Sequence, residues 1–327
     1  MNIIEKLKRK TINDFLYESV HKVDSYFVNK RKYTDKFTFV NKSNGAENLL
    51  LVIAGFQPYY WDAVFERVKE NQANFSEDID VCICIPEGIT NAKEQLKSIC
   101  EKNNWSYLYL KRDMLSQVQN VAIRLHANAK WIFKIDEDIL LSHNYFKKLK
   151  DRYMEVNSNA DYPVGMMCPL ININACCFIK FLESLNKRLE FETRFGKIRV
   201  DLRNPHDIIH HSSDAAKFLW ECSVPFDEVA KTIEHQNKGK FFMSPVRFSI
   251  GAILFTRKYW ETIGGFNVGF YGGMGVEEEQ VCGNNVNFYE PTYVAEDIFV
   301  GHLGYYSQKE ICKQFFYDNQ TLIRLKE

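Results

Sequence analysis

Four short apolar runs alternate with segments of helical spacing in the first half of this sequence. The runs are NLLLVIAG, DVCICIP, WSYLYL and WIFKI, and Gly or Pro ends the first two. Continuous apolar runs are typical of strands that are buried on both faces of a sheet. Strands that alternate with helices predict an α/β fold with a doubly wound, mostly parallel sheet and helices on both faces.

Composition indicates an ordinary globular protein. The chain has 327 residues, of which 46% are hydrophobic and 26% charged, enough for a large core in one α/β domain or two smaller ones. Lys plus Arg (42) equals Asp plus Glu (42). A dedicated nucleic-acid binder normally carries a basic excess, so we expect no nucleic-acid partner.

The nine cysteines indicate a reducing compartment. None forms a CxxC pair, and most lie in apolar runs, as Cys82, Cys84 and Cys168 do. We find no signal peptide and no apolar run long enough to span a membrane. The sequence therefore predicts a cytoplasmic protein. Its oligomeric state is left open.

Residues 1–45 are expected to form a helical, charge-rich leader. Basic residues stand beside apolar ones in its first 15 positions. Such a helix either touches the inner face of a membrane peripherally or packs on the domain, and packing is the commoner outcome.

Three adjacent acids, Asp136, Glu137 and Asp138, follow the fourth apolar run. Parallel sheets bind ligands beyond the carboxyl ends of their strands, which is where these acids fall. Because alternate residues of a strand share a side, Asp136 and Asp138 can converge while Glu137 turns away. Two carboxylates suit Mg²⁺ or Mn²⁺. The alternative is a solvated turn.

Three stretches together resemble the GT-A fold glycosyltransferases, in particular the large inverting family (family 2-like) that uses nucleotide-sugar donors. They are QNVAIRLHANAKWIFKIDEDIL, SIGAILFTRKYWETIGGFNVGFYGGMGVEEEQVC and EPTYVAEDIFVGHLG. The resemblance implies a Rossmann-like sheet with a nucleotide-sugar-binding half (46–171) and an acceptor and catalytic half with a C-terminal tail (246–327). The irregular insertion 172–245 between them would lie on the acceptor side.

The resemblance also implies site residues. Asp136 and Asp138 would hold the divalent metal, with His302 as a third ligand or a diphosphate contact. Glu278 would be the general base, with Glu277 as its neighbour or substitute. The remaining implied residues would bind the nucleotide sugar: Ala54, Gly55, Phe56, Gln57, Glu87, Asn120, Asp136 and Glu137.

The sequence departs from the family at several positions. Gln119 stands where the family usually has Arg, Glu87 stands alone after the second run, and the acidic pair is Glu-Glu. The base therefore stays open among Glu277, Glu278 and Glu279, with Asp297 as a rival. An acidic first turn is also favoured by the helix dipole without any catalytic role.

Other polar clusters have more than one interpretation. His206 and His210 have helical i,i+4 spacing beside His211 and could bind zinc, but an acceptor-side or structural role is favoured. The run Lys111-Arg112-Asp113 is either a donor contact or a solvated loop. Arg247 and Arg257 could meet phosphate, although surface arginine is commoner.

We therefore expect an enzyme of polysaccharide biosynthesis. It would be a metal-dependent, inverting glycosyltransferase that moves a sugar from a nucleoside diphosphate, most simply a UDP-sugar, to a hydroxyl of a glycan or lipid-linked acceptor. One alternative is a sugar-nucleotide nucleotidyltransferase, which should carry a Gly-rich, Arg-containing loop where this chain has AGFQPYY. A non-catalytic glycan-binding protein and a hydrolase are the others.

Overall fold

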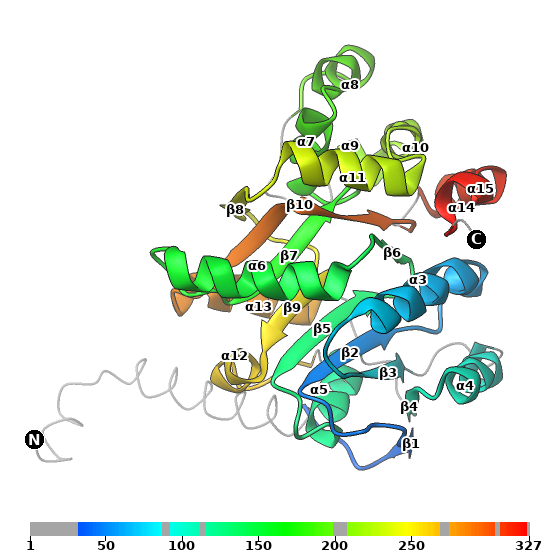
Figure 1. Cartoon of the computed structure of the whole chain (residues 1–327), viewed down its shortest axis with the longest axis vertical. Coiled ribbons are helices and arrows are strands. Elements are labelled where there is room, and N and C mark those ends of the chain that lie inside the picture. Colours follow the sequence, from blue (N-terminus) through cyan, green and yellow to red (C-terminus); the bar gives the residue numbers. More distant parts are fainter. Residues whose placement is uncertain are drawn as a thin grey trace, which may run out of the picture.

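The computed structural model describes residues 32–86, 92–111, 115–198, 208–268, 275–304 and 308–325. A central ten-stranded sheet runs through the described part, with strand order β1-β4-β3-β2-β5-β9-β7-β10-β6, and β8 pairs with β10 (Figure 1). The predicted α/β fold with a doubly wound, mostly parallel sheet and helices on both faces is confirmed. The antiparallel strands enter at the edges and at one central position.

The first half of the sheet is parallel apart from its edge. Strands β4, β3, β2 and β5 run in one direction, and β1 pairs antiparallel with β4. Because β3 and β4 are added on one side of β2 and β5 on the other, the order reverses between β2 and β5. Ligands bind at such a switch point. The strands are β1 (Phe37–Val40), β2 (Asn48–Ile53), β3 (Ile79–Ile85), β4 (Ser106–Leu110) and β5 (Trp131–Asp136).

The second half of the sheet is mixed. Strand β9 lies antiparallel between β5 and β7, which brings the chain before β9 to the end of β5. Strands β7 and β10 are parallel, whereas β6 and β8 pair antiparallel with β10. The strands are β6 (Ile139–Leu141), β7 (Met166–Ile171), β8 (Phe241–Met243), β9 (Ala252–Thr256) and β10 (Thr292–His302).

Helices cover both faces of the sheet. Figure 1 shows α3 and α6 in front of the sheet and α5 and α13 behind it. The helices outside 172–245 are η1 (Pro58–Tyr60), α3 (Trp61–Asn74), α4 (Ala92–Asn103), α5 (Leu115–Leu125), α6 (Tyr145–Asn159), α12 (Arg257–Thr262), α13 (Val276–Asn287), α14 (Lys309–Asp318) and α15 (Gln320–Ile323).

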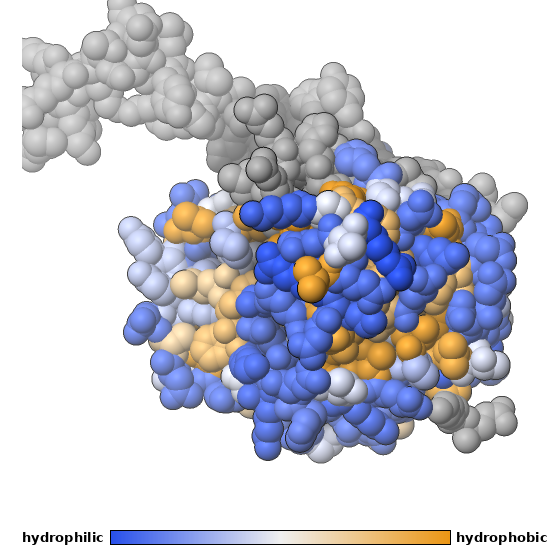
Figure 2. All heavy atoms as spheres, turned by 90° about the horizontal axis from the view of Figure 1, so that it is seen from above, coloured by the Kyte–Doolittle hydropathy of each residue, from blue (hydrophilic) through white to orange (hydrophobic). Residues whose placement is uncertain are grey.

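The stretch 172–245 is mostly helical in its described part. Its helices gather at the β10 end of the molecule (Figure 1). Viewed from that end, the surface is mainly hydrophilic, with patches of apolar residues between the polar ones (Figure 2). The helices are α7 (Cys177–Ser184), α8 (Arg188–Phe195), α9 (Ile208–His211), α10 (Ser213–Glu221) and α11 (Phe226–Gln236).

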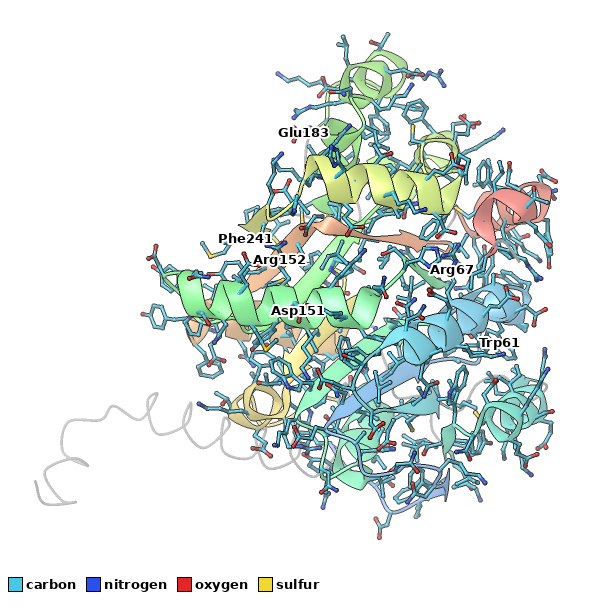
Figure 3. The ribbon with its side chains drawn as sticks, viewed as in Figure 1. Trp61, Arg67, Asp151, Arg152, Glu183 and Phe241 are labelled. Carbon is cyan, nitrogen blue, oxygen red and sulfur yellow. The ribbon has the colours of Figure 1, made fainter. Side chains whose placement is uncertain are left out.

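Buried Arg67 on α3 joins the two halves (Figure 3). Its guanidinium pairs with Asp227 on α11 at 2.8 Å and donates to the carbonyls of Leu141 and Ile323. A buried charge needs such partners. The contact holds α11 and α15 against the first half of the sheet.

All nine cysteines are unbridged, and seven of them are buried. The described helices include none with the length and apolar character required to cross a bilayer. Most of the leader (1–31) lies outside the described residues, and so does its predicted membrane contact.

Candidate active site

A cavity of about 400 Å³ opens at the switch point between β2 and β5. Three of its walls come from different parts of the chain: the turn after β2, the start of α5, and the start of α13. The residues that line it include Phe56, Gln57, Leu115, Gln119, Lys134, Asp136, Glu137, Asp138, Arg247, Ser249, Glu277, Glu278, His302, Gly304 and Lys309. The fold thus brings together the three stretches on which the family resemblance was based.

Asp138 lies on the floor of this cavity with only 6% of its side chain exposed. Its Oδ2 accepts a hydrogen bond from Gln57 Nε2 at 2.7 Å, and its other oxygen, Oδ1, is buried without a hydrogen-bond partner. Leaving a buried acceptor unsatisfied costs about 1–3 kcal/mol. Since Asp138 is part of the cavity wall, the unsatisfied oxygen is a ready binding point for a ligand.

Gly304 makes room for this arrangement. A Cβ at this position would stand 2.5 Å from Asp138 Oδ2 and 2.7 Å from the Gln57 amide. Any larger residue would therefore displace the side chains that form the floor.

Asp136 ends β5 and is paired with a lysine. Its Oδ1 lies 2.7 Å from Lys134 Nζ, which also donates to the carbonyl of Ile250. Lys134 is 5% exposed, whereas 36% of the Asp136 side chain is accessible. The two residues are two positions apart in a strand and therefore share a side. Lys134 is a cavity residue that sequence reasoning missed, although this spacing would have indicated it.

Glu137 also lines the cavity, but its carboxylate is bound by the protein. Its carboxylate accepts hydrogen bonds from the backbone N–H groups of Gly55 and Phe56 and from the indole of Trp61. Burial raises the pKa of Glu137 to about 7, although these three donors oppose the rise. Both oxygens are occupied by the protein, so Glu137 holds the turn after β2 in place and is badly placed for the direct donor contact that was predicted.

We expect Glu137→Gln to lower the free energy of unfolding by about 1–3 kcal/mol, because its amide NH₂ would face an N–H donor. Chemical denaturation of the variant beside wild type measures the change. Glu290→Gln is the control, because Glu290 is partly buried but lies outside the cavity lining. Equal stability of Glu137→Gln and wild type would contradict the positioning role.

The turn after β2 uses its backbone donors internally. Ala54 donates its N–H to the Cys84 carbonyl, and those of Gly55 and Phe56 go to Glu137. The sequence predicted that all four residues of this turn, Ala54, Gly55, Phe56 and Gln57, cradle the nucleotide. Only the last two line the cavity.

His302 ends β10 and faces Asp138, with 3.4 Å between its Nε2 and Asp138 Oδ2. Its Nδ1 contacts the carbonyl of Ile173 at 3.2 Å. Burial alone would lower the pKa of His302, but the Asp138 carboxylate and the Ile173 carbonyl outweigh it and the pKa is raised.

The acids of α13 separate into three environments. Glu278 lines the cavity with 15% of its side chain exposed and accepts from Arg247 Nε at 2.5 Å. Glu277 is also buried at the wall and accepts from the Ser116 hydroxyl on α5 at 2.9 Å. Glu279 is 67% exposed and outside the cavity lining. Asp297, the rival base, lies outside the cavity lining, where it pairs with Arg152 on α6 and accepts from the Gly239 N–H.

Burial raises the pKa of Glu278, and the neighbouring Arg247 opposes the rise. A carboxylate with a raised pKa that stays partly accessible in a cavity is suited to accept a proton.

Two further residues that the sequence analysis considered, Asn120 and Arg257, lie outside the cavity lining. Asn120 is fully buried, and its amide bonds to Lys32, Trp260 and both backbone groups of Phe266. It anchors the chain after α12 and does not reach the cavity. Arg257 donates to carbonyls of Ile123, His126 and Ala129, so it is structural rather than a phosphate contact.

Several predicted residues lie outside the described part. Glu87, Arg112, Asp113 and His206 are among them, as is the side chain of His210. The predicted zinc alternative for the His cluster is therefore not described.

Gln119 and Lys309 also line the cavity without having been assigned there. Gln119 is 1% exposed, and its Oε1 is buried with no partner. The departure of Gln119 from the family pattern was visible in the sequence. No pattern indicated Lys309, the first residue of α14, because its approach depends on the path of the chain after β10.

The described residues contain no group of three or more His, Cys, Asp or Glu side chains arranged to hold a metal ion. Asp136, Asp138 and His302 thus do not form the predicted three-ligand set in this structure, and Asp136 Oδ1 is instead paired with Lys134. Asp138 and His302 remain together, and Asp138 has a free oxygen. Mg²⁺ is commonly bound through one or two protein groups and completed by substrate phosphates and water. The two residues fit a site of that kind.

No protein-family model matches the chain, and no curated protein is significantly similar to it. Solved structures with similar folds include a mannosyltransferase, PcManGT from Pyrobaculum calidifontis, in complex with GDP-Man and Mn²⁺. It is 12% identical, with 86% of this chain and 64% of that chain covered and a TM-score of 0.47. GalNAc-T7 with UDP, GalNAc and Mn²⁺ is 12% identical, with 80% and 44% covered and a TM-score of 0.43. TarS from S. aureus is 12% identical, with 38% and 21% covered and a TM-score of 0.31. The chain spans less than two thirds of the length of each.

Proposed function

We propose that this protein is a glycosyltransferase that moves a sugar from a nucleoside diphosphate donor to a hydroxyl of a glycan or lipid-linked acceptor. The observation that carries the proposal is the buried, unpartnered Asp138 Oδ1 in a cavity that also holds a carboxylate suited to act as a base, Glu278. A UDP-sugar donor and inversion at the anomeric carbon are part of the proposal and are supported by the family resemblance of the sequence.

The donor would lie across the switch point. Asp138 and His302 would hold a Mn²⁺ or Mg²⁺ ion, which when bound neutralises the charge that develops on the departing diphosphate. Lys309, which also lines the cavity, would supply a further positive charge near the phosphates. Phe56, Leu115 and Gln119 form the wall nearest β2 and α5, where the nucleoside would bind.

Glu278 would accept the proton of the acceptor hydroxyl. A sugar hydroxyl is a poor nucleophile, and a carboxylate within hydrogen-bond reach assists its attack on the anomeric carbon. Glu278 lies in the first turn of α13 and lines the same cavity as Asp138. Glu277 accepts a hydrogen bond from Ser116 and so holds the start of α13 against α5.

The cavity walls disfavour the alternatives. A nucleotidyltransferase needs free backbone donors after its first strand to cradle a triphosphate, and here Glu137 binds two of them. A purely glycan-binding protein needs neither an unpartnered buried carboxylate oxygen nor a half-buried base.

Arg247→Gln tests the role of Glu278 through pH. Arg247 lowers the pKa of Glu278 against the effect of burial. Removing its charge therefore raises that pKa, and since a base must be deprotonated, the acid limb of the kcat profile should move to higher pH. Arg188→Gln, which removes an exposed ion pair with Glu183 far from the cavity, is the control. If the limb stays in place or moves to lower pH, another group is the base.

The proposal is tested by thermal unfolding with UDP, GDP and their sugar conjugates, each with and without Mn²⁺. A ligand that binds only the native state raises the Tm by mass action. We expect one nucleoside diphosphate to raise the Tm of wild type only when Mn²⁺ is present, and Asp138→Ala to lose the response. No shift with any of these ligands, or an equal shift in the variant, would overturn the proposal.

A further inference from the structure

The stretch 172–245 was expected to serve the acceptor, but two of its residues hold His302. Asn172 is fully buried directly after β7, and its Oδ1 accepts the backbone N–H of His302 at 2.9 Å. Trp220 on α10 donates its indole N–H to the carbonyl of His302 at 3.0 Å. Both backbone groups of His302 are thus bound by side chains from one distant segment.

The orientation of the Asn172 amide follows from its partners. Its Oδ1 also accepts the N–H of Ile173, and its Nδ2 donates to Ser223 Oγ. Two N–H donors can only face an oxygen. Ser223 Oγ donates to the carbonyl of Leu219, which ties the amide to the end of α10.

The same segment selects the tautomer of the ring. The carbonyl of Ile173, the residue after Asn172, faces His302 Nδ1 at 3.2 Å. A carbonyl oxygen only accepts, so Nδ1 carries a proton. With Nδ1 protonated, a neutral ring presents the lone pair of Nε2, and Nε2 is the nitrogen that faces Asp138.

Close packing leaves little freedom for this arrangement. A Cβ on Gly301 would stand 2.6 Å from the Trp220 ring and 2.9 Å from Phe226. Only glycine lets α10 approach β10 closely enough for the indole to reach the carbonyl of the next residue.

We propose that Asn172 and Trp220 are positioning residues that set the orientation and tautomer of His302, so that Nε2 and Asp138 can bind one divalent cation. This inference rests on the proposed function for its metal, although the contacts themselves do not. It assigns the α10 segment to the donor side of the site. Partners of this kind typically change metal affinity by about 10- to 100-fold when they are removed.

Mn²⁺ binding is measured by electron paramagnetic resonance on the full chain, with and without UDP or GDP. The variants are Trp220→Phe, which removes the N–H but keeps a ring, and Asn172→Ala. Two matched controls remove the same groups elsewhere: Trp105→Phe, whose indole donates to Gln72, and Asn71→Ala, a buried amide bound to Arg67 and Ser142. The ring ¹⁵N shifts of His302 are recorded on Mn²⁺-free samples of the same proteins, because the paramagnetic ion would broaden the signals of its ligands, with His302→Gln used to assign them.

We expect both variants to weaken Mn²⁺ binding at least about tenfold, while each loses no more Tm than its control. We also expect the ¹⁵N shifts, recorded at a pH at which the ring is neutral, to change from a single Nδ1–H tautomer to a mixture. Wild-type affinity and an unchanged tautomer in both variants would overturn the inference. If wild type binds no Mn²⁺ in any condition, the metal of the proposed function fails, and the ¹⁵N shifts alone decide whether Asn172 and Trp220 set the tautomer.

Discussion

Asp138→Asn should lower kcat/KM for the acceptor by at least about 10³-fold. The assay contains Mn²⁺ and a donor concentration that saturates wild type. The change is nearly isosteric, so the side chain still fills the floor under Gly304 and still reaches Gln57. It removes the negative charge whose free oxygen would bind the cation. Charge stabilisation of this kind is usually the largest single contribution to catalysis, and losing one element of it typically costs about 10²–10³-fold or more.

The control for this change is Asp151→Asn on α6 (Figure 3), where the carboxylate is 51% exposed and pairs with Lys147. It removes the same charge from the protein without touching the cavity. Released nucleoside diphosphate and transferred sugar are measured together, which also separates transfer from hydrolysis. Transfer by Asp138→Asn within about tenfold of wild type would remove Asp138 from the mechanism.

Glu278→Gln should lower kcat by about 10²–10⁴-fold while leaving the affinity for the donor nearly unchanged. The amide keeps the size of the side chain and can still accept from Arg247, but it cannot take a proton. We expect donor affinity to be preserved because, in the proposed function, Glu278 acts on the acceptor hydroxyl whereas Asp138 acts on the donor. Steady-state kinetics with saturating donor, together with a donor titration, measures both quantities.

The variants Glu277→Gln and Glu279→Gln are compared with Glu278→Gln. Glu279 is largely exposed, so its variant should keep wild-type kcat. Glu277 accepts a hydrogen bond from Ser116, so Glu277→Gln should lower the stability of the protein more strongly than it lowers kcat. A larger kcat loss in Glu277→Gln than in Glu278→Gln would move the base to Glu277.

The parallel half of the sheet was predictable because a local sequence pattern marks each of its strands. Each apolar run from Leu49 to Ile135 is buried on both faces and is separated from the next by a helix, so order and direction follow from chirality and connection length. The carboxyl ends of β2 and β5 must then lie side by side. This is why Asp136, Asp138 and the turn that contains Gln57 could be assigned to one crevice from sequence.

The remainder depends on pairings between distant residues. Nothing local indicates that β9 inserts antiparallel between β5 and β7, and it is this strand that brings Ile250 to Lys134. The irregular pairing of β10 with β7 between Ala295 and Phe299 likewise decides where Asp297 points. A motif match can give the position of a residue without giving its contacts. The sequence places Asn120 on α5 but does not show that its amide bonds to Phe266 rather than to a ligand.

Anomalous X-ray diffraction would test whether Asp138 and His302 bind the metal beside the diphosphate. The crystals are grown with Mn²⁺ and the nucleoside diphosphate that raises the Tm most. We expect one manganese peak bound by Asp138 and His302 and in contact with the diphosphate, with Lys134 still paired to Asp136. A nucleotide bound elsewhere, or a nucleotide in this cavity with no manganese beside Asp138, would contradict it.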